Sequence, residues 1–173
     1  NTQSGFNIPV LVLKKPDKSI RISLDARLLN QKLIPDRFPL PAMSDVFSTI
    51  STKLSMSSGC FVSQFDIHRG YWQILVDKND SKKLAFSHNR NHYESNRMLY
   101  GLQSAPAAFC RIIHRLFGQN SSFVAYLDDL LIIDADFDAH VKNIEFLLQT
   151  CERYGLLLSA KKVSLFADKI DFL

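Results

Sequence analysis

Two adjacent aspartates, Asp128 and Asp129, interrupt an otherwise apolar stretch, and this feature constrains the fold more than any other. The apolar residues on either side, 123–127 and 130–133, are rich in types that favour β-strands, whereas aspartate is depleted in strands. We therefore expect a tight hairpin with both carboxylates at its tip. An ordinary solvent-facing turn would instead have polar flanks that contain glycine.

A third aspartate repeats the pattern. Asp66 ends the β-prone segment 60–65, and no turn glycine follows before Gly70. Carboxylates that gather at the edge of a buried sheet repel one another unless a cation neutralises them. Mg²⁺ prefers a few carboxylates together with water and substrate phosphates. From the residues alone, two interpretations stay open: metal-dependent phosphoryl transfer, and a structural turn.

The remaining patterns predict an α+β domain with an antiparallel sheet. A β-hairpin is expected from the alternating segments 8–13 and 19–24 around Pro16-Asp17, and a short helix capped by Ser44 follows. Helical spacing of Phe109, Ile113 and Phe117 predicts a helix from Ala105 with these residues in the core. A further helix is expected after Asp138 and before Gly155, then strands at 156–159 and 163–166.

Length and composition agree with one globular domain. The chain has 173 residues, 46% of them hydrophobic and 22% charged, and no apolar run approaches the roughly 20 residues that span a bilayer. Three cysteines fit neither a zinc site nor a disulfide framework, and reduced thiols suit a cytosol-like compartment. The first 40 residues hold seven Lys and Arg against three Asp. This basic excess suits either a phosphate-binding surface or a solvated edge.

Several motifs in a fixed order carry a resemblance to a known family. Tyr126-Leu127-Asp128-Asp129 resembles the Tyr-X-Asp-Asp box of reverse transcriptases, and residues 62–74 resemble the strand with that family's first catalytic Asp, followed by Gly-Tyr and Gln. Residues 21–30 are similar to its fingers motif, residues 97–109 to its template-contact box, and residues 140–172 to the helix and strands that close the palm. The pattern is that of gypsy-type LTR retrotransposons and their retroviral relatives.

This resemblance implies an RNA-directed DNA polymerase with a two-metal site. Asp66, Asp128 and Asp129 would form the catalytic and metal-binding set, with Asp66 and Asp128 as direct ligands and Asp129 in support. The cofactor would be two Mg²⁺ ions, with Mn²⁺ as the alternative. One ion would activate the primer 3′-hydroxyl, and the other would hold the triphosphate and stabilise the leaving pyrophosphate.

The resemblance also implies roles for residues around the carboxylates. Deoxynucleotide binding would fall to a set drawn from several motifs: Lys15, Arg21, Gly70, Tyr71 and Gln103. The template would be contacted by Arg27, Tyr100 and Gly101. Tyr71 is expected to exclude a ribose 2′-hydroxyl, and the alternative for this residue is a core aromatic.

The expected architecture is a fingers–palm domain without a thumb. Fingers would be about residues 1–40 and 75–98, and palm about 41–74 and 99–173. Partners would be an RNA or DNA template with primer, deoxynucleoside triphosphates and the rest of a polyprotein with thumb and RNase H, but no membrane. We expect a cytoplasmic location or virus-like particles, without excluding the nucleus. Two rivals remain: a repurposed or inactive nucleic-acid-binding domain, and a polymerase that makes RNA.

Overall fold

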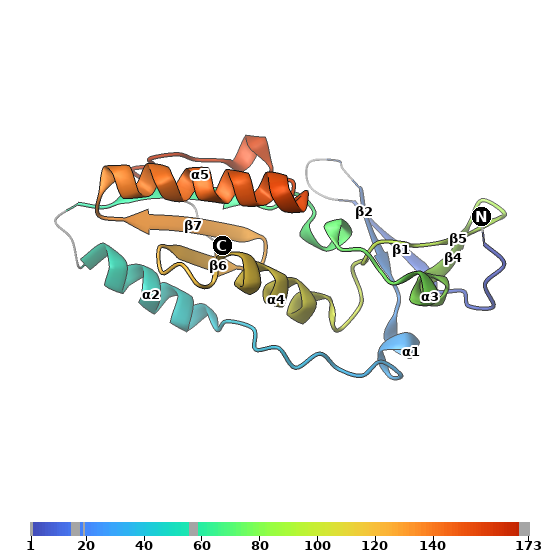
Figure 1. Cartoon of the computed structure of the whole chain (residues 1–173). Coiled ribbons are helices and arrows are strands. Elements are labelled where there is room, and N and C mark those ends of the chain that lie inside the picture. The colour runs from blue at the N-terminus through green and yellow to red at the C-terminus, as the bar shows by residue number, and fades with distance from the viewer. Residues whose placement is uncertain (1, 15–17, 19, 56–58, 170–173) are drawn as a thin grey trace. The chain divides into compact units, whose positions relative to one another are not determined.

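The structure is a computed structural model that describes residues 2–14, 18, 20–55 and 59–169 (Figure 1). The chain divides into two compact units, which we describe separately. The first comprises residues 1–37 and 71–108, and the second comprises residues 38–70 and 109–173. Among the described residues, no helix is long and apolar enough to cross a membrane.

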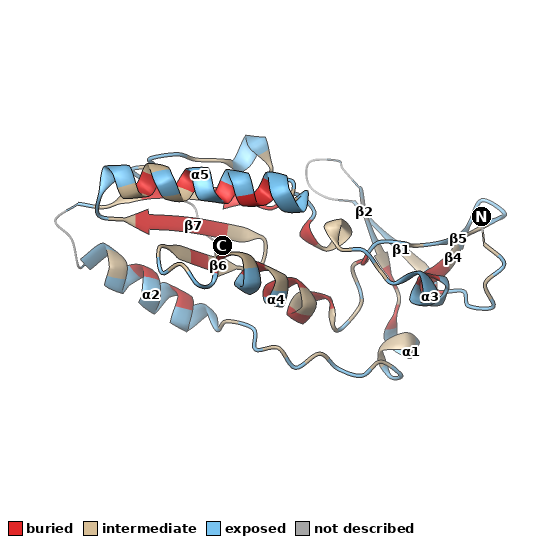
Figure 2. Ribbon diagram, viewed as in Figure 1, coloured by how far each residue is buried: buried red, intermediate tan, exposed pale blue. Residues whose placement is uncertain are grey.

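An antiparallel three-stranded sheet forms the centre of the second unit. Its strands are β3 (Phe61–Asp66), β6 (Phe123–Tyr126) and β7 (Asp129–Asp134), in the order β3–β7–β6. Residues 130–133 of the central strand β7 are all buried (Figure 2). A strand buried on both faces reads as a continuous apolar run, which explains why this segment shows no polar alternation.

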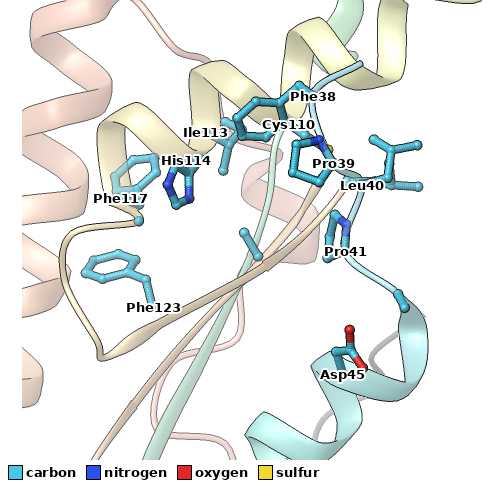
Figure 3. A pocket seen from close by; sticks show the side chains of 14 residues that line it. Phe38, Pro39, Leu40, Pro41, Asp45, Cys110, Ile113, His114, Phe117 and Phe123 are labelled. Atoms are coloured by element: carbon cyan, nitrogen blue, oxygen red, sulfur yellow. The ribbon is translucent and has the colours of Figure 1, made fainter. Parts of the chain in front are cut away.

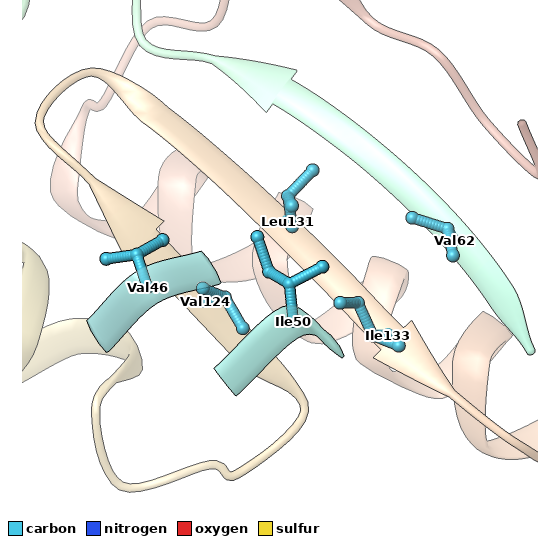
Figure 4. Packing of buried hydrophobic residues seen from close by; sticks show 6 residues of the cluster. All are labelled: Val46, Ile50, Val62, Val124, Leu131 and Ile133. Carbon is cyan, nitrogen blue, oxygen red and sulfur yellow. The ribbon is translucent and has the colours of Figure 1, made fainter. Parts of the chain in front are cut away.

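Helices cover both faces of that sheet. α5 (Phe137–Tyr154) lies on one face, while α2 (Met43–Ser55) and residues 109–117 of α4 (Ala105–Phe117) lie on the other (Figure 1). α2 packs through an aliphatic cluster shared with the three strands (Figure 4). The members of this cluster are Val46, Ile50, Val62, Val124, Leu131 and Ile133. Phe109, Ile113 and Phe117 are each no more than 2% exposed, which confirms their predicted place in the core.

The helix ends correct two predictions. α5 begins at Phe137, so Asp138 lies inside its first turn, and the cap is Asp136, whose carboxylate accepts from the Ala139 amide at 2.8 Å. Gly155 ends this helix as predicted, with a left-handed φ of 67° that glycine adopts without steric cost. α2 begins at Met43, so Ser44 is a helical residue instead of its cap.

The segment after α5 does not form the two predicted strands. Residues 156–169 contain the short 3₁₀ helix η3 (Ala160–Lys162) and form isolated bridges along the edge of β3: Ser164 with Gln64, and Leu158 with Ile67, the residue that follows the strand. Hydrogen bonds from Ser159, Ser164 and Ala167 to backbone carbonyls of β3 run along this outer edge of the strand.

The first unit is built from two hairpins and short helices. β1 (Val10–Lys14) pairs with β2 (Ile20–Leu24) as predicted, although the expected Pro16-Asp17 turn lies outside the described residues. A second hairpin, β4 (Ala85–His88) with β5 (Asn91–Glu94), was not expected from the sequence. The short helices are α1 (Arg27–Asn30), η1 (Gly70–Gln73), α3 (Lys78–Ser81) and η2 (Lys82–Leu84). The buried core of this unit consists of Ile8, Leu24, Ala26, Leu84 and Leu99.

Candidate active site

The turn between β6 and β7 presents the adjacent aspartates, as the apolar flanks predict. Tyr126 pairs with Asp129, so Leu127 and Asp128 are the two central residues of a tight hairpin. Leu127 has a φ of 50°, a left-handed conformation that favours glycine and costs a leucine roughly 1 kcal/mol. The backbone at Asp128 is therefore held in place by the surrounding packing at some cost in energy.

The third carboxylate belongs to the neighbouring strand. Asp66 is the last residue of β3 and pairs directly with Asp129 in the β3–β7 ladder. Just beyond it, the Ile67 amide donates to the Asp128 carbonyl at 2.8 Å. The sheet register thus gathers the three predicted catalytic aspartates at one end of the second unit.

The electrostatics of this end are unbalanced toward negative charge. The pKa of Asp129 is raised above its ordinary value, mainly by burial and further by the charge of Asp66. A hydrogen bond from Gln64 and the nearby charge of Lys162 oppose this rise but do not cancel it. The site therefore favours the approach of a cation.

Lys162 is a site residue that sequence analysis missed. Its ammonium nitrogen Nζ lies 2.6 Å from Oδ2 of Asp66. The hydrogen bond to Asp66 raises the pKa of the lysine, and the charges of Asp66, Asp129 and Asp128 act in the same direction. A lysine 96 residues away along the chain carries no local signal of this pairing.

Gly70 fits into the same site for steric reasons. A Cβ atom at this position would lie 2.6 Å from Oδ1 of Asp128 and 2.6 Å from ring atoms of Phe109. The glycine is buried, so any larger residue here would force the Phe109 ring or the Asp128 carboxylate to shift. Packing around Asp128 therefore explains why a glycine occupies this position.

The carboxylates suit a divalent cation by their chemistry. Oxygen ligands on neighbouring strand ends match the preference of Mg²⁺ and Mn²⁺, which keep water and substrate oxygens in their coordination shell. No group of three His, Cys, Asp or Glu side chains among the described residues is arranged to enclose a metal by itself. An ion held by these carboxylates would complete its coordination with water and substrate oxygens.

An apolar cavity of about 600 Å³ lies beside the hairpin (Figure 3). Residues 38–42 line one side, residues of α4 and β6 line another, and Leu127 is part of the wall. Asp45 and His114 contribute its polar groups. Ligands that enter this space would contact the residue next to Asp128.

The first unit holds the predicted aromatic residues Tyr71 and Tyr100. Their ring centroids lie 5.1 Å apart, and both side chains are only half-buried. Tyr71 is therefore not a fully buried core aromatic. Gly101 follows with a φ of 105°, and a Cβ there would lie 2.1 Å from the Leu24 carbonyl oxygen, so glycine is required.

Gln103 and Arg27 make local contacts in the first unit. The Gln103 side-chain amide donates to the Asn30 carbonyl at 2.8 Å and to the Leu33 carbonyl at 3.4 Å. Arg27 forms two hydrogen bonds with Asp25, at 2.6 and 2.7 Å, while its side chain stays 85% exposed. Arg21 belongs to β2, and Lys15 lies outside the described residues.

Comparison with known proteins gives a consistent result. A family profile described as "Reverse transcriptase (RNA-dependent DNA polymerase)" matches residues 13–173. The chain is 32% identical over 154 residues to the enzymatic polyprotein of Cauliflower mosaic virus (strain CM-1841), which covers 88% of this chain and 22% of that polyprotein. It is also 32% identical to the Pol polyprotein of transposon 297 from Drosophila melanogaster, over 99% of this chain and 16% of that protein.

Solved structures share the fold. A foamy viral protease–reverse transcriptase in complex with an RNA/DNA hybrid matches with a TM-score of 0.86 at 23% identity, over 99% of this chain and 22% of that chain. The same type of protein bound to double-stranded DNA matches with a TM-score of 0.83 at 22% identity. The predicted mixed fold with an antiparallel sheet is thereby confirmed. The chain spans about a fifth of these relatives.

Proposed function

Because this chain belongs to the reverse transcriptase family, we propose that it is the fingers–palm part of an RNA-directed DNA polymerase. It would extend a primer 3′-hydroxyl with deoxynucleotides on an RNA or DNA template. We assign the first unit, residues 1–37 and 71–108, to the fingers and the second unit, residues 38–70 and 109–173, to the palm. The first two boundaries lie three and four residues from those expected from the sequence, but the last boundary of the fingers moves from residue 98 to residue 108.

One observation carries the proposal. Asp66 and Asp129 are paired in register on adjacent strands, and Asp128 stands in the turn that precedes Asp129. The raised pKa of Asp129, caused by burial and then by the charge of Asp66, supports a cation site at this end of the sheet, because a bound cation would stabilise the ionised carboxylates.

Asp66 and Asp128 would hold the metal ions, with Asp129 supporting them. When bound, two Mg²⁺ ions would lower the pKa of the primer hydroxyl and offset the charge that develops on the triphosphate. The residues of this chain would position these carboxylates. The β3–β7 register sets Asp66 opposite Asp129, and the lack of a side chain at Gly70 leaves room for Phe109 and Asp128.

Nucleotide binding is proposed for residues drawn from several motifs. Lys15 and Arg21 would hold the triphosphate, since an ammonium and a planar guanidinium both suit phosphate oxygens. Gly70 and Tyr71 would lie at the sugar, where the half-buried tyrosine ring would exclude a 2′-hydroxyl. Gln103 would contribute to nucleotide binding from its position beside α1. Its side-chain amide is held there by hydrogen bonds to two carbonyl groups.

Template contact is proposed for Arg27, Tyr100 and Gly101. The exposed Arg27 guanidinium suits a phosphate, and the half-buried Tyr100 ring suits a base or sugar. Further proposed partners are the remaining segments of a polyprotein, including a thumb and RNase H, and the proposed location is the cytoplasm or a virus-like particle.

A primer-extension assay tests the proposal. The chain, alone and extended by the following polyprotein residues, is incubated with an RNA template, a DNA primer, deoxynucleotides and Mg²⁺. We expect extension that falls at least about 100-fold in Asp66→Asn, because a metal ligand contributes several kcal/mol to the reaction. Binding of primer–template without any extension by the longer chain would favour a repurposed binding domain.

A further inference from the structure

Lys162 forms an ion pair with one of the carboxylates, and the two partners differ in their exposure to solvent. Its Nζ atom lies 2.6 Å from Asp66 Oδ2. The Asp66 side chain is only 12% exposed, whereas the Lys162 side chain is 67% exposed. The ammonium group can therefore move away into solvent, whereas the carboxylate is held in the protein interior.

The backbone around Lys162 is tied to the strand that carries Asp66. The Ser159 amide donates to the Asp66 carbonyl at 2.8 Å, and the Lys162 amide donates to the Ser159 carbonyl at 2.9 Å. Ser164 and Gln64 exchange two hydrogen bonds at 2.7 and 3.0 Å. The 3₁₀ helix η3 thus stands between two anchored points, and the side chain of Lys162 is the part that is free to move.

We propose that Lys162 is a built-in counter-ion that holds Asp66 in the metal-free protein and competes with a divalent cation for this carboxylate. The inference rests on the proposed function, because it takes Asp66 as a metal ligand. An oxygen 2.6 Å from an ammonium group cannot accept a dication without strong repulsion between the two positive charges. Binding of Mg²⁺ or Mn²⁺ therefore releases the lysine.

Two consequences follow for the protein before metal binds. The ion pair lowers the repulsion among Asp66, Asp128 and Asp129, whose charges all act on Lys162. It also lowers the apparent affinity for the metal, because the cation must displace a resident charge. An exposed lysine gives up such a pair at small cost, so the competition weakens metal binding without preventing it.

The test measures metal binding by this chain directly. Mn²⁺ affinity is determined by calorimetry, and the melting temperature is recorded in EDTA and in Mg²⁺. Lys162→Met removes the charge but keeps the length of the side chain, Lys162→Arg keeps the charge, and Lys161→Met is the matched control on an exposed neighbour. Asp66→Asn reports whether the metal uses the proposed site.

We expect Lys162→Met to bind Mn²⁺ roughly five-fold more tightly, as the loss of one partly exposed competing charge predicts. It should also melt lower in EDTA and gain more from Mg²⁺ than wild type, while Lys162→Arg and Lys161→Met behave like wild type. If folded Lys162→Met binds Mn²⁺ as tightly as wild type or more weakly, the inference about Lys162 is overturned, while the proposed metal site stands. Binding that does not change in Asp66→Asn would instead overturn the metal site of the proposed function.

Discussion

Asp66 and Asp129 are direct partners in the β3–β7 ladder, and the charge of Asp66 adds to the burial that raises the pKa of Asp129. Burial is the larger cause of the raised pKa of Asp129. Side chains that face each other across a ladder interact strongly, and like charges there destabilise a sheet. The proposed catalytic end of the palm is therefore a source of instability in the metal-free protein.

Asp129→Asn should stabilise the metal-free protein at pH 7. A carboxyl whose folded pKa is raised contributes its full stability below its ordinary pKa, about 4, and loses it as the pH rises through the folded value. The melting temperature in EDTA should thus rise by about 2 °C at pH 7 and stay near that of wild type at pH 4. Differential scanning fluorimetry across this pH range checks both points, and a lower melting temperature at pH 7 would contradict the assignment.

His140→Leu should destabilise the second unit by about 2–4 kcal/mol, because it leaves buried polar partners unsatisfied. His140 is fully buried; its Nε2 lies 2.8 Å from the Ser63 hydroxyl and its Nδ1 lies 2.9 Å from Asp134 Oδ2. Urea denaturation measures the loss, with the exposed His88→Gln as the control. A double-mutant cycle with Ser63→Ala should give a coupling above about 0.5 kcal/mol, and additive effects would refute a shared network.

Gly70→Ala should lower the free energy of unfolding by about 1–3 kcal/mol, as overpacking does in a filled core. The added methyl group would fall 2.6 Å from Phe109 and Asp128 atoms. Gly59→Ala in the same unit is the matched control, because its Cβ would meet nothing within 4 Å. Unfolding in guanidinium chloride should separate the two variants, and equal stabilities would show that the Phe109 ring moves aside.

Tyr71→Val should raise ribonucleotide incorporation relative to deoxynucleotide incorporation by more than about tenfold in primer extension. The half-buried position of the ring predicts a stability loss below the roughly 3–5 kcal/mol that truncation of a core aromatic costs. Tyr100→Val is the control: it removes the neighbouring ring, whose centroid lies 5.1 Å away, and should leave the preference for deoxynucleotides unchanged. A Tyr71 variant that still rejects ribonucleotides would return this residue to a packing role.

The aspartate hairpin could be predicted from the sequence because its signal is local. Apolar residues on both sides of Asp128 and Asp129 leave few alternatives to a tight turn between buried strands. Asp66 was found in the same way. The family resemblance implied only that Asp66 shares a site with the other two aspartates. The register that opposes Asp66 to Asp129 is a long-range property, which the structure shows.

Other features lacked such a signal. The β4–β5 hairpin turns at Asn89 and Arg90, both with positive φ, and arginine gives no warning of this conformation. Asp136 and Asp138 are both suitable N-cap residues for α5, and their spacing alone does not favour one over the other. The pairing of Lys162 with Asp66, and that of His140 with Ser63, depend on tertiary packing that no local pattern encodes.

Strand β7 has a carboxylate at each end, and the two carboxylates lie in opposite electrostatic environments. At one end, Asp134 accepts hydrogen bonds from His140, from the Ser122 hydroxyl and from the Asn143 amide. At the other end, Asp129 faces a like charge. A library of variants selected only for heat resistance would therefore preserve Asp134 and discard Asp129, so directed evolution of this domain must select for synthesis and stability together.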